Sequence, residues 1–325
     1  MELVHDIRAI LRRARSGEPG LDAAAAERLW GAILDDALDA VEVGAILGAL
    51  SALGETFEEL VGLQGAVRQR MPRWEPALDA RAISIAAYCG VGGEAAIVSL
   101  TAMLLRRFGV PVIVHGLLES GCGLSSACVL RHLGVLPSGS LAHAEALLGE
   151  SGIAYVPIQL LAPRFAWLLA ARARLGVENA AHVVAPTIDP LRGASARVMM
   201  SVAAPAGDCS EALAENAPGD LVSLRWPAPR TEATLAMRPR IECVRAGERR
   251  TLFEADVQEM RFGPSLPPAD AEGTARWIER VASGAIPVPV AALAIVSACL
   301  YAVGRASGLN EAKAMAAYHA ARLAA

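Results

Sequence analysis

The sequence predicts an α/β fold in which a small all-helical domain accompanies a larger domain built on a mainly parallel sheet. The first seventy residues contain helix-capping signals and helical apolar spacing. From Ile83 onward, short apolar segments alternate with alanine-rich stretches. Such alternation is typical of parallel strands with helices on both faces. We therefore expect a small helical domain over 1–73 and a large α/β domain over 81–325.

The helices of the first domain are predicted from side chains that can cap them. Asp39 and Glu42 form a capping pair for a helix over residues 40–53, and Thr56 with Glu59 forms a capping box for the next. Within residues 40–53, four apolar side chains recur on one face and predict a packing surface. The apolar residues left over would be exposed in a monomer, among them Leu38, Val41 and Ala45.

The strands of the large domain are predicted from short apolar runs bounded by turn residues. The section from Ala203 to Pro239 is rich in proline and acidic residues and predicts the least regular structure. The strand candidates are Ile83–Tyr88, Val110–Val114, Ala154–Pro157, Val198–Ala203 and Asp220–Leu224.

Composition excludes several classes of protein. A chain of 325 residues with 54% hydrophobic and 20% charged residues buries a large core and is not disordered. The net charge of −4 argues against a protein whose whole surface binds nucleic acid, although a local stripe of arginines is compatible with this charge. Six cysteines without a CxxC pair predict neither a zinc site nor a disulfide framework, and they favour a cytoplasmic protein.

The one membrane-like segment is the apolar run Ala285–Gly304. Pro287 and Pro289 interrupt its start and leave about fourteen helical residues, fewer than the roughly twenty that span a bilayer. We expect a buried core helix here and no membrane partner.

A glycine-rich turn is the strongest functional signal. Gly90-Val91-Gly92-Gly93-Glu94 follows a predicted strand and precedes a predicted helix. Such a turn brings backbone N–H groups close to a ligand at a helix N-terminus, where phosphate is commonly bound. The alternative interpretation is a tight strand-to-helix connection without a ligand.

The chain resembles the nucleoside phosphorylase and anthranilate phosphoribosyltransferase family. The likeness rests on the glycine turn and on four later segments in the same order: Val114–Leu117, Leu175–Val177, Pro186–Pro190 and Asp220–Leu224. The resemblance implies the phosphoribosyltransferase fold of the nucleoside phosphorylase type and a homodimer through the N-terminal helices. It also implies that residues of about 163–180 return to the small domain.

In the family, a GTGGD turn and a KHGN segment hold the diphosphate of phosphoribosyl pyrophosphate. The resemblance therefore assigns substrate binding here to Gly90, Gly92, Gly93, Glu94, Ser99, His115 and Gly116. The basic and amide groups of the family's loop are replaced by Val114, Leu117, Leu118 and Gly123. Fixed cations or metal stabilise a departing diphosphate, so their loss predicts a degenerate site.

The family's magnesium pair is also incomplete. Asp220 stands for its aspartate, whereas Leu221 replaces its glutamate. One carboxylate is a poor magnesium anchor without substrate phosphates, so Asp220 is a weak metal candidate, and Mg²⁺ is expected only if the chain is a transferase. His115 has two interpretations, a phosphate donor or a hydrogen-bonded structural residue.

The acceptor side is better preserved. Arg172 falls where the family's anthranilate-contacting arginine lies, although a solvated arginine on an amphipathic helix is an equal interpretation. Val114–Gly116 and Asn179–His182 resemble the YbiB-like branch of paralogues, which is associated with sequence-independent nucleic-acid binding. The candidates for that contact are Arg164, Arg172 and Arg174, and Trp74 is a residue that either stacks on a base or is buried.

These observations leave three functions open. The first is a degenerate phosphoribosyltransferase-like protein without assigned catalytic residues that binds nucleic acid or another ligand. The second is an active glycosyltransferase or phosphoribosyltransferase with an altered donor or acceptor. The third is a structural or regulatory dimer.

Overall fold

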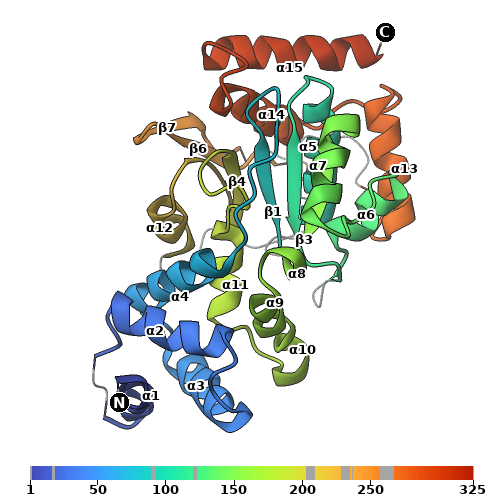
Figure 1. The fold of residues 1–325 in the computed structure, drawn as a ribbon. Coiled ribbons are helices and arrows are strands. Elements are labelled where there is room, and N and C mark those ends of the chain that lie inside the picture. Colours follow the sequence, from blue (N-terminus) through green and yellow to red (C-terminus); the bar gives the residue numbers. More distant parts are fainter. Residues whose placement is uncertain are drawn as a thin grey trace.

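The computed structural model describes residues 2–16, 19–88, 93–119, 123–202, 209–227, 235, 237–256 and 267–324. It has two lobes (Figure 1). The N-terminal helices lie in the lower lobe, and the sheet with the C-terminal helix lies in the upper one. We call these the small lobe and the large lobe.

The small lobe starts with four helices whose beginnings follow the predicted caps. The Asp39 and Thr56 side chains each accept the N3 backbone N–H, and Glu42 and Glu59 accept in return, so both predicted capping boxes are confirmed. The helices are α1 (Glu2–Ser16), α2 (Ala23–Leu34), α3 (Ala40–Leu53) and α4 (Phe57–Arg70).

Later segments of the chain lie beside these helices (Figure 1). Asn179 caps α11, and its side-chain amide donates to the carbonyl of Leu168 at 2.9 Å, which ties α11 to α9. The elements are α8 (Ile158–Leu161), α9 (Pro163–Ala170), α10 (Arg172–Leu175), α11 (Ala180–Val184) and the 3-10 helix η1 (Ala185–Thr187).

The large lobe is built on a seven-stranded sheet of order β3-β2-β1-β4-β5-β6-β7. Five strands are parallel, and β6 and β7 form an antiparallel hairpin at one edge. The mainly parallel sheet is thus confirmed, but the hairpin was not predicted. The strands are β1 (Ile83–Ala87), β2 (Val112–Gly116), β3 (Ile153–Pro157), β4 (Ala196–Val202), β5 (Asp220–Trp226), β6 (Arg240–Arg245) and β7 (Glu248–Phe253).

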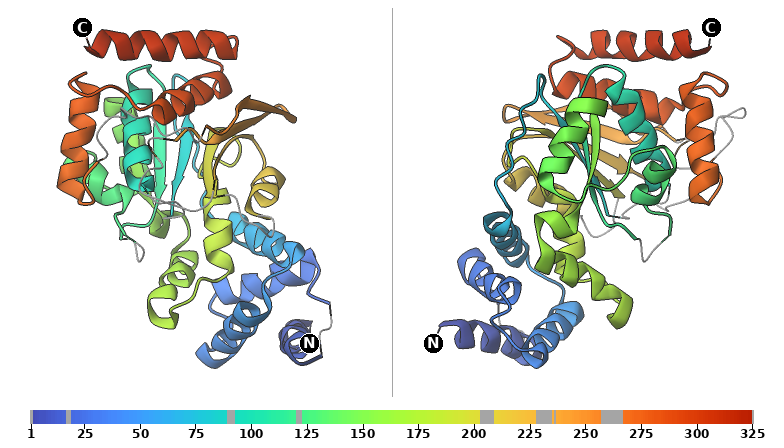
Figure 2. Two further views of the ribbon diagram at one scale, coloured as in Figure 1. Left: turned by 180° about the vertical axis from the view of Figure 1, so that it is seen from behind. Right: turned by 45° about the vertical axis from the view of Figure 1, so that its right-hand side comes forward.

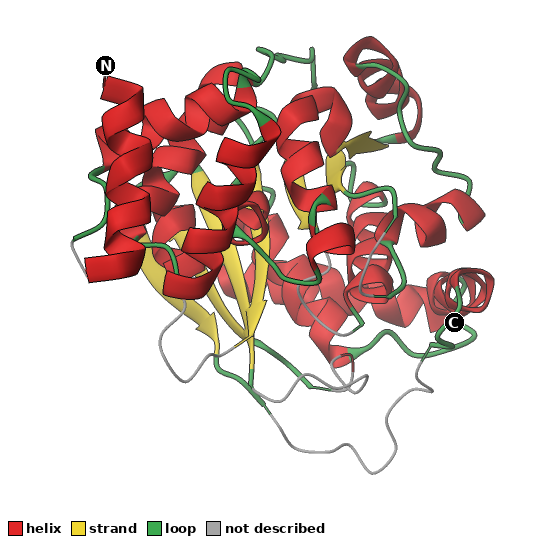
Figure 3. Ribbon diagram, turned by 90° about the horizontal axis from the view of Figure 1, so that it is seen from below, coloured by secondary structure: helices red, strands yellow, loops and turns green. Residues whose placement is uncertain are grey.

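Helices cover both faces of this sheet (Figure 2). One core lies between one sheet face and α5, α13 and α14, and a second core continues from the other face into the small lobe. Figure 3 views the molecule from the side of the small lobe. The covering helices are α5 (Glu94–Arg106), α6 (Ser126–His132), α7 (Leu141–Ser151), α12 (Cys209–Asn216), α13 (Ala271–Ala282) and α14 (Val290–Ala302). The C-terminal helix α15 (Leu309–Ala324) packs against α14.

The apolar run after Pro289 forms α14, in which ten of thirteen residues are buried. This confirms the predicted core helix. Over the described part of the chain, no helix combines the length and the apolarity needed to cross a membrane.

One residue that the sequence analysis expected to be exposed is buried. Leu38 is only 8% exposed and belongs to the core of the small lobe, whereas Val41 is 80% exposed and Ala45 is also exposed. Leu38 precedes Asp39, the N-cap of α3, so it is not part of the helix. The helical periodicity of α3 therefore does not determine the direction of its side chain.

Candidate functional site

The candidate site lies at the carboxyl ends of β1 and β2. These strands are parallel neighbours, and Ala87 is aligned with Gly116 at their last residues. In open α/β sheets, ligands bind beyond the carboxyl ends of the strands. Of the predicted turn, Gly90, Val91 and Gly92 lie outside the described residues. Gly93 has φ 77°, a left-handed conformation suited to glycine, and directly precedes α5.

Glu94 and Ser99 both lie on α5 and are both buried. Glu94 is 7% exposed in the first turn, where a carboxylate is favoured by the helix dipole. Ser99 is fully buried, and its hydroxyl has no hydrogen-bond partner in the described structure. Ser99 therefore lies on the buried face of α5, where a ligand cannot reach it.

Gly116 is required by the backbone of the neighbouring strand. A Cβ atom built on Gly116 would lie 1.9 Å from the carbonyl oxygen of Ala87. No side chain larger than hydrogen fits there without displacing β1. The close approach of two strands explains this glycine without invoking a ligand.

His115 is buried beside Tyr88. The Tyr88 hydroxyl lies 3.0 Å from His115 Nδ1, and the two rings meet edge to face with centroids 5.5 Å apart. Burial lowers the pKa of His115 to about 3 and raises the pKa of Tyr88. His115 is therefore neutral near pH 7 and supplies no positive charge.

The segment after β2 is tied down by bonds to its backbone. Tyr155 Oη donates to the carbonyl of Leu117 at 2.6 Å, and Ser125 Oγ donates to the carbonyl of Leu118 at 2.9 Å. The side chain of Val114 is buried in the core, and Leu118 is 37% exposed. The side chains of Val114 and Leu118 are apolar and supply no positive charge at the end of β2.

Asp220 lies at the amino-terminal ends of the strands, whereas this site lies at their carboxyl ends. In the ladder it is aligned through Ala196 with Ile83, the first residue of β1, whereas the candidate site follows the last residue. Its carboxylate pairs with Arg81 at 2.6 Å and accepts the backbone N–H of Ala246 at 2.9 Å. Asp220 therefore lies at the amino-terminal ends of the strands, away from Ala87 and Gly116.

A second carboxylate, which the sequence analysis missed, lies near the carboxyl ends of β4 and β5. Glu211 in the first turn of α12 is 6% exposed and accepts from Ser201 Oγ at 3.1 Å and Ser223 Oγ at 3.0 Å. Arg225 Nε also donates to it at 2.7 Å, and a second contact completes an ion pair. Its position just after a predicted strand was the only available signal.

Asp220 and Glu211 do not form a paired magnesium site. Asp220 and Glu211 are each neutralised by an arginine, and they belong to opposite ends of the strands. Throughout the described ranges, no three histidine, cysteine, aspartate or glutamate side chains are grouped so as to hold a metal.

The three candidate arginines lie on α9 and α10, and two of them are paired. Arg164 bonds to Asp36 and lies over the Trp167 ring at 4.7 Å, and Arg172 pairs with Glu178 at 2.7 Å. Arg174 is exposed and forms no ion pair within the described structure. Trp167 is 42% exposed, whereas Trp74 is 6% exposed and is buried in the core.

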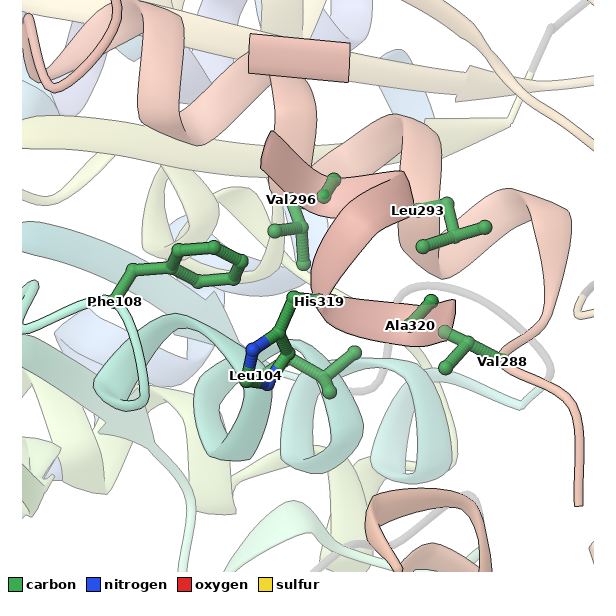
Figure 4. Close-up of a pocket in the computed structure, with 8 residues that line it drawn as sticks. Leu104, Phe108, Val288, Leu293, Val296, His319 and Ala320 are labelled. Carbon is green, nitrogen blue, oxygen red and sulfur yellow. The ribbon is translucent and has the colours of Figure 1, made fainter. Parts of the chain in front are cut away.

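Two cavities lie away from the candidate site. A cavity of about 30 Å³ separates α4 from η1 and the end of α12, and is lined in part by Gln64, Thr187 and Arg192. An apolar cavity of about 10 Å³ lies between α5, α14 and α15, where His319 meets Phe108 (Figure 4). Each has room for at most a few water molecules.

Comparison with known proteins identifies the architecture. Residues 8–71 match the helical bundle domain of the glycosyl transferase family. Anthranilate phosphoribosyltransferase from Thermus thermophilus superposes with a TM-score of 0.71 at 22% identity, covering 97% of this chain and 95% of that one. The chain has the anthranilate phosphoribosyltransferase fold. The enzyme from Saccharomyces cerevisiae, solved in complex with PRPP and Mg, gives a TM-score of 0.72 at 13% identity, with 99% and 94% covered.

Sequence relatives support the same family resemblance. The uncharacterized protein YbiB of Escherichia coli K12 is 28% identical over 313 residues, 94% of this chain and 97% of that protein. Anthranilate phosphoribosyltransferase of Methylocella silvestris is 32% identical over 174 residues, 52% of this chain and 48% of that enzyme. The predicted resemblance to this family and to YbiB is thereby confirmed. The chain aligns with about half the length of the Methylocella silvestris enzyme.

Proposed function

We propose that this chain is a binding protein with the anthranilate phosphoribosyltransferase fold and a degenerate phosphoribosyl pyrophosphate site. The observation that carries the proposal is His115, the residue retained from the family's basic segment. It is buried, neutral near pH 7 and bonded to Tyr88. Val114, Leu117 and Leu118 beside it are apolar, so the charge of a diphosphate would meet no compensating cation from this segment.

Calorimetry with phosphoribosyl pyrophosphate and Mg²⁺ tests this proposal. We expect no binding heat at ligand concentrations of about a millimolar, since the loop cations and a second magnesium carboxylate are missing. An anthranilate phosphoribosyltransferase such as the yeast enzyme serves as the positive control. A magnesium-dependent dissociation constant in the micromolar range would restore the transferase interpretation.

For the ligand, we propose nucleic acid bound weakly and without sequence preference on the face of α9 and α10. Arg174 is exposed, and Arg164 and Arg172 lie on the same pair of helices. To bind phosphates, Arg164 and Arg172 would have to break their ion pairs with Asp36 and Glu178. The loss of these pairs reduces the favourable free energy of binding, so the affinity for nucleic acid is low. A mobility shift at low salt with single- or double-stranded DNA is the test, and its absence would remove nucleic acid as the ligand.

The second candidate is a transferase with an altered donor or acceptor, for which Arg172 is the favouring observation. Its guanidinium is partly exposed and is held by a surface carboxylate that a substrate carboxylate could replace. Mg²⁺ belongs to the proposal only in this case. Turnover of a phosphorylated sugar donor with an aromatic carboxylate would establish it.

We also propose a cytoplasmic homodimer formed through the small lobe. Of the twelve large apolar side chains exposed in the described structure, eight belong to α1, α3, α4 and the segment 163–180. Exposed apolar residues gathered on one lobe favour burial against another chain. The eight are Val4, Leu11, Val41, Leu53, Phe57, Trp167, Leu175 and Val177. This surface also supports the third candidate, a structural or regulatory dimer.

A further inference from the structure

Helix α12 is attached to the rest of the molecule mainly by polar contacts. Only three of its eight residues are buried, and one of these is the charged Glu211. Leu213 reaches the core shared with the small lobe, and Ala214 belongs to a small separate cluster with Met199 and Leu221. By contrast, α14 buries ten of thirteen residues in the main core.

The polar attachments hold both ends of α12. At its start, Glu211 accepts from Ser201, Ser223 and Arg225. At its end, the buried Arg197 donates to the carbonyls of Ala214 at 2.8 Å and Ala217 at 3.1 Å. The side chains that donate these bonds all come from β4 and β5, so they fasten α12 to the sheet.

One residue of the small lobe fastens α12 from the other side. Gln64 of α4 is 8% exposed, and its Nε2 donates to the carbonyl of Leu213 at 2.8 Å and to Thr187 Oγ1 at 2.9 Å. Its Oε1 accepts from Asn216 Nδ2 at 3.2 Å. Both hydrogens and the oxygen of this amide are thus satisfied, and two of the three bonds go to α12.

Packing around these bonds is incomplete. The cavity of about 30 Å³ lies between α4, η1 and the residues that follow α12, and Gln64 lines it. The orientation of α12 against the small lobe therefore depends on hydrogen bonds more than on close-packed apolar surface. Segments with few buried apolar contacts open locally at lower free energy than the core does.

We propose that α12 opens as a unit while the sheet stays folded, and that Gln64 is the latch between this helix and the small lobe. Opening separates Glu211 from Arg225 at the carboxyl end of β5. The guanidinium of Arg225 then has no ion-pair partner, and it lies at the carboxyl ends of the strands, as the candidate site does. The small lobe controls this step, because the latch residue belongs to α4.

Hydrogen exchange measured by mass spectrometry tests the proposal on the full chain. In the wild-type protein, amides of α12 should exchange faster than those of α14. Gln64→Leu keeps similar volume but removes all three bonds, and should accelerate exchange in α12 roughly tenfold while α14 is unchanged. Gln69→Leu is the matched control, because Gln69 lies on the same helix, is exposed and bonds to Glu27 within the small lobe.

Asn216→Ala provides a milder variant if Gln64→Leu does not fold. Asn216 is exposed and contributes one bond to the latch, so a smaller acceleration confined to α12 is expected. The proposal fails if wild-type α12 exchanges as slowly as α14, if exchange in α12 is unchanged in the latch variants, or if α12 and α14 accelerate equally.

Discussion

The Tyr88 hydroxyl lies 3.0 Å from Nδ1 of His115, and both side chains are buried at the ends of adjacent strands. The hydroxyl and the ring nitrogen share one hydrogen bond, whose donor is set by the imidazole tautomer. The pair is thus a neutral hydrogen-bonded unit at the carboxyl ends of β1 and β2.

We expect this unit to make stability depend on pH. Burial lowers the pKa of His115 from 6.5 to about 3 in the folded protein, so the unfolded chain binds a proton first as pH falls. The stabilisation is complete above pH 6.5 and decreases by about 1.4 kcal/mol per pH unit below it, down to about pH 3. Urea unfolding of wild type and His115→Gln at pH 7.5 and 5 measures the difference.

His115→Gln should lose less stability on acidification than wild type, by about 2 kcal/mol at pH 5. His132→Gln is the control, because His132 is exposed and lies outside the core. Identical pH profiles for wild type and His115→Gln would show that the ring is not held neutral.

Gly116→Ala should destabilise the fold whether or not a ligand binds. Its Cβ would lie 1.9 Å from the Ala87 carbonyl, and relieving this overlap requires the strands to separate, at a cost of about 1–3 kcal/mol or more. Gly149→Ala in α7, which has open space around the position, should instead stabilise by about 0.5–1 kcal/mol. Thermal unfolding compares them, and equal shifts would contradict the steric explanation.

The homodimer proposal predicts a mass close to twice 33.8 kDa by light scattering. Val41→Lys places a charge on the 80% exposed apolar residue of α3 and should shift the protein toward monomer. Leu136→Lys, on a 58% exposed residue of the large lobe, should leave the mass unchanged. A wild-type monomer at tens of micromolar would refute the dimer.

Replacing Arg164, Arg172 and Arg174 together with alanine should lower nucleic-acid affinity and flatten its salt dependence. Each neutralised phosphate contributes about 0.7 to 0.9 to the log–log slope, so three lost contacts reduce the slope by about 2 to 3. A matched triple variant removes three exposed arginines of α6 and α13: Arg131, Arg276 and Arg280. Equal slopes in both triple variants would exclude the α9 and α10 face.

The sequence was sufficient for the parallel half of the fold because its strands are short, buried apolar runs with regular spacing. The hairpin β6–β7 was missed because β7 starts with three consecutive charged residues, Glu248, Arg249 and Arg250, and its first four residues are exposed, so it is not a buried apolar run. Helix α12 was missed because only three of its eight residues are buried and one of these, Glu211, is charged, so the helix shows no apolar stripe.

The candidate site was predicted less completely, because its chemistry depends on partners far apart in the chain. The pairing of Arg164 with Asp36 spans 128 residues, and no local pattern announces it. Asp220 was a metal candidate through the family resemblance, and the register of β1, β4 and β5 places it at the amino-terminal ends of the parallel strands, opposite the candidate site. Glu211 was not identified for the same reason, because it lies on a helix and its partners come from β4 and β5.

The shared core between the small lobe and the sheet has a consequence for how the protein is made. Helices α1–α4 leave the ribosome before β1–β3, α8, α9 and α11 exist, yet residues from all of these segments build one apolar cluster. Part of the apolar surface of α1–α4 therefore stays uncovered until Leu213 has been synthesised. Leu213 is the last buried residue of that cluster in chain order. Domains usually fold as units during translation. Here the first lobe to be synthesised is completed only after more than half of the chain has emerged.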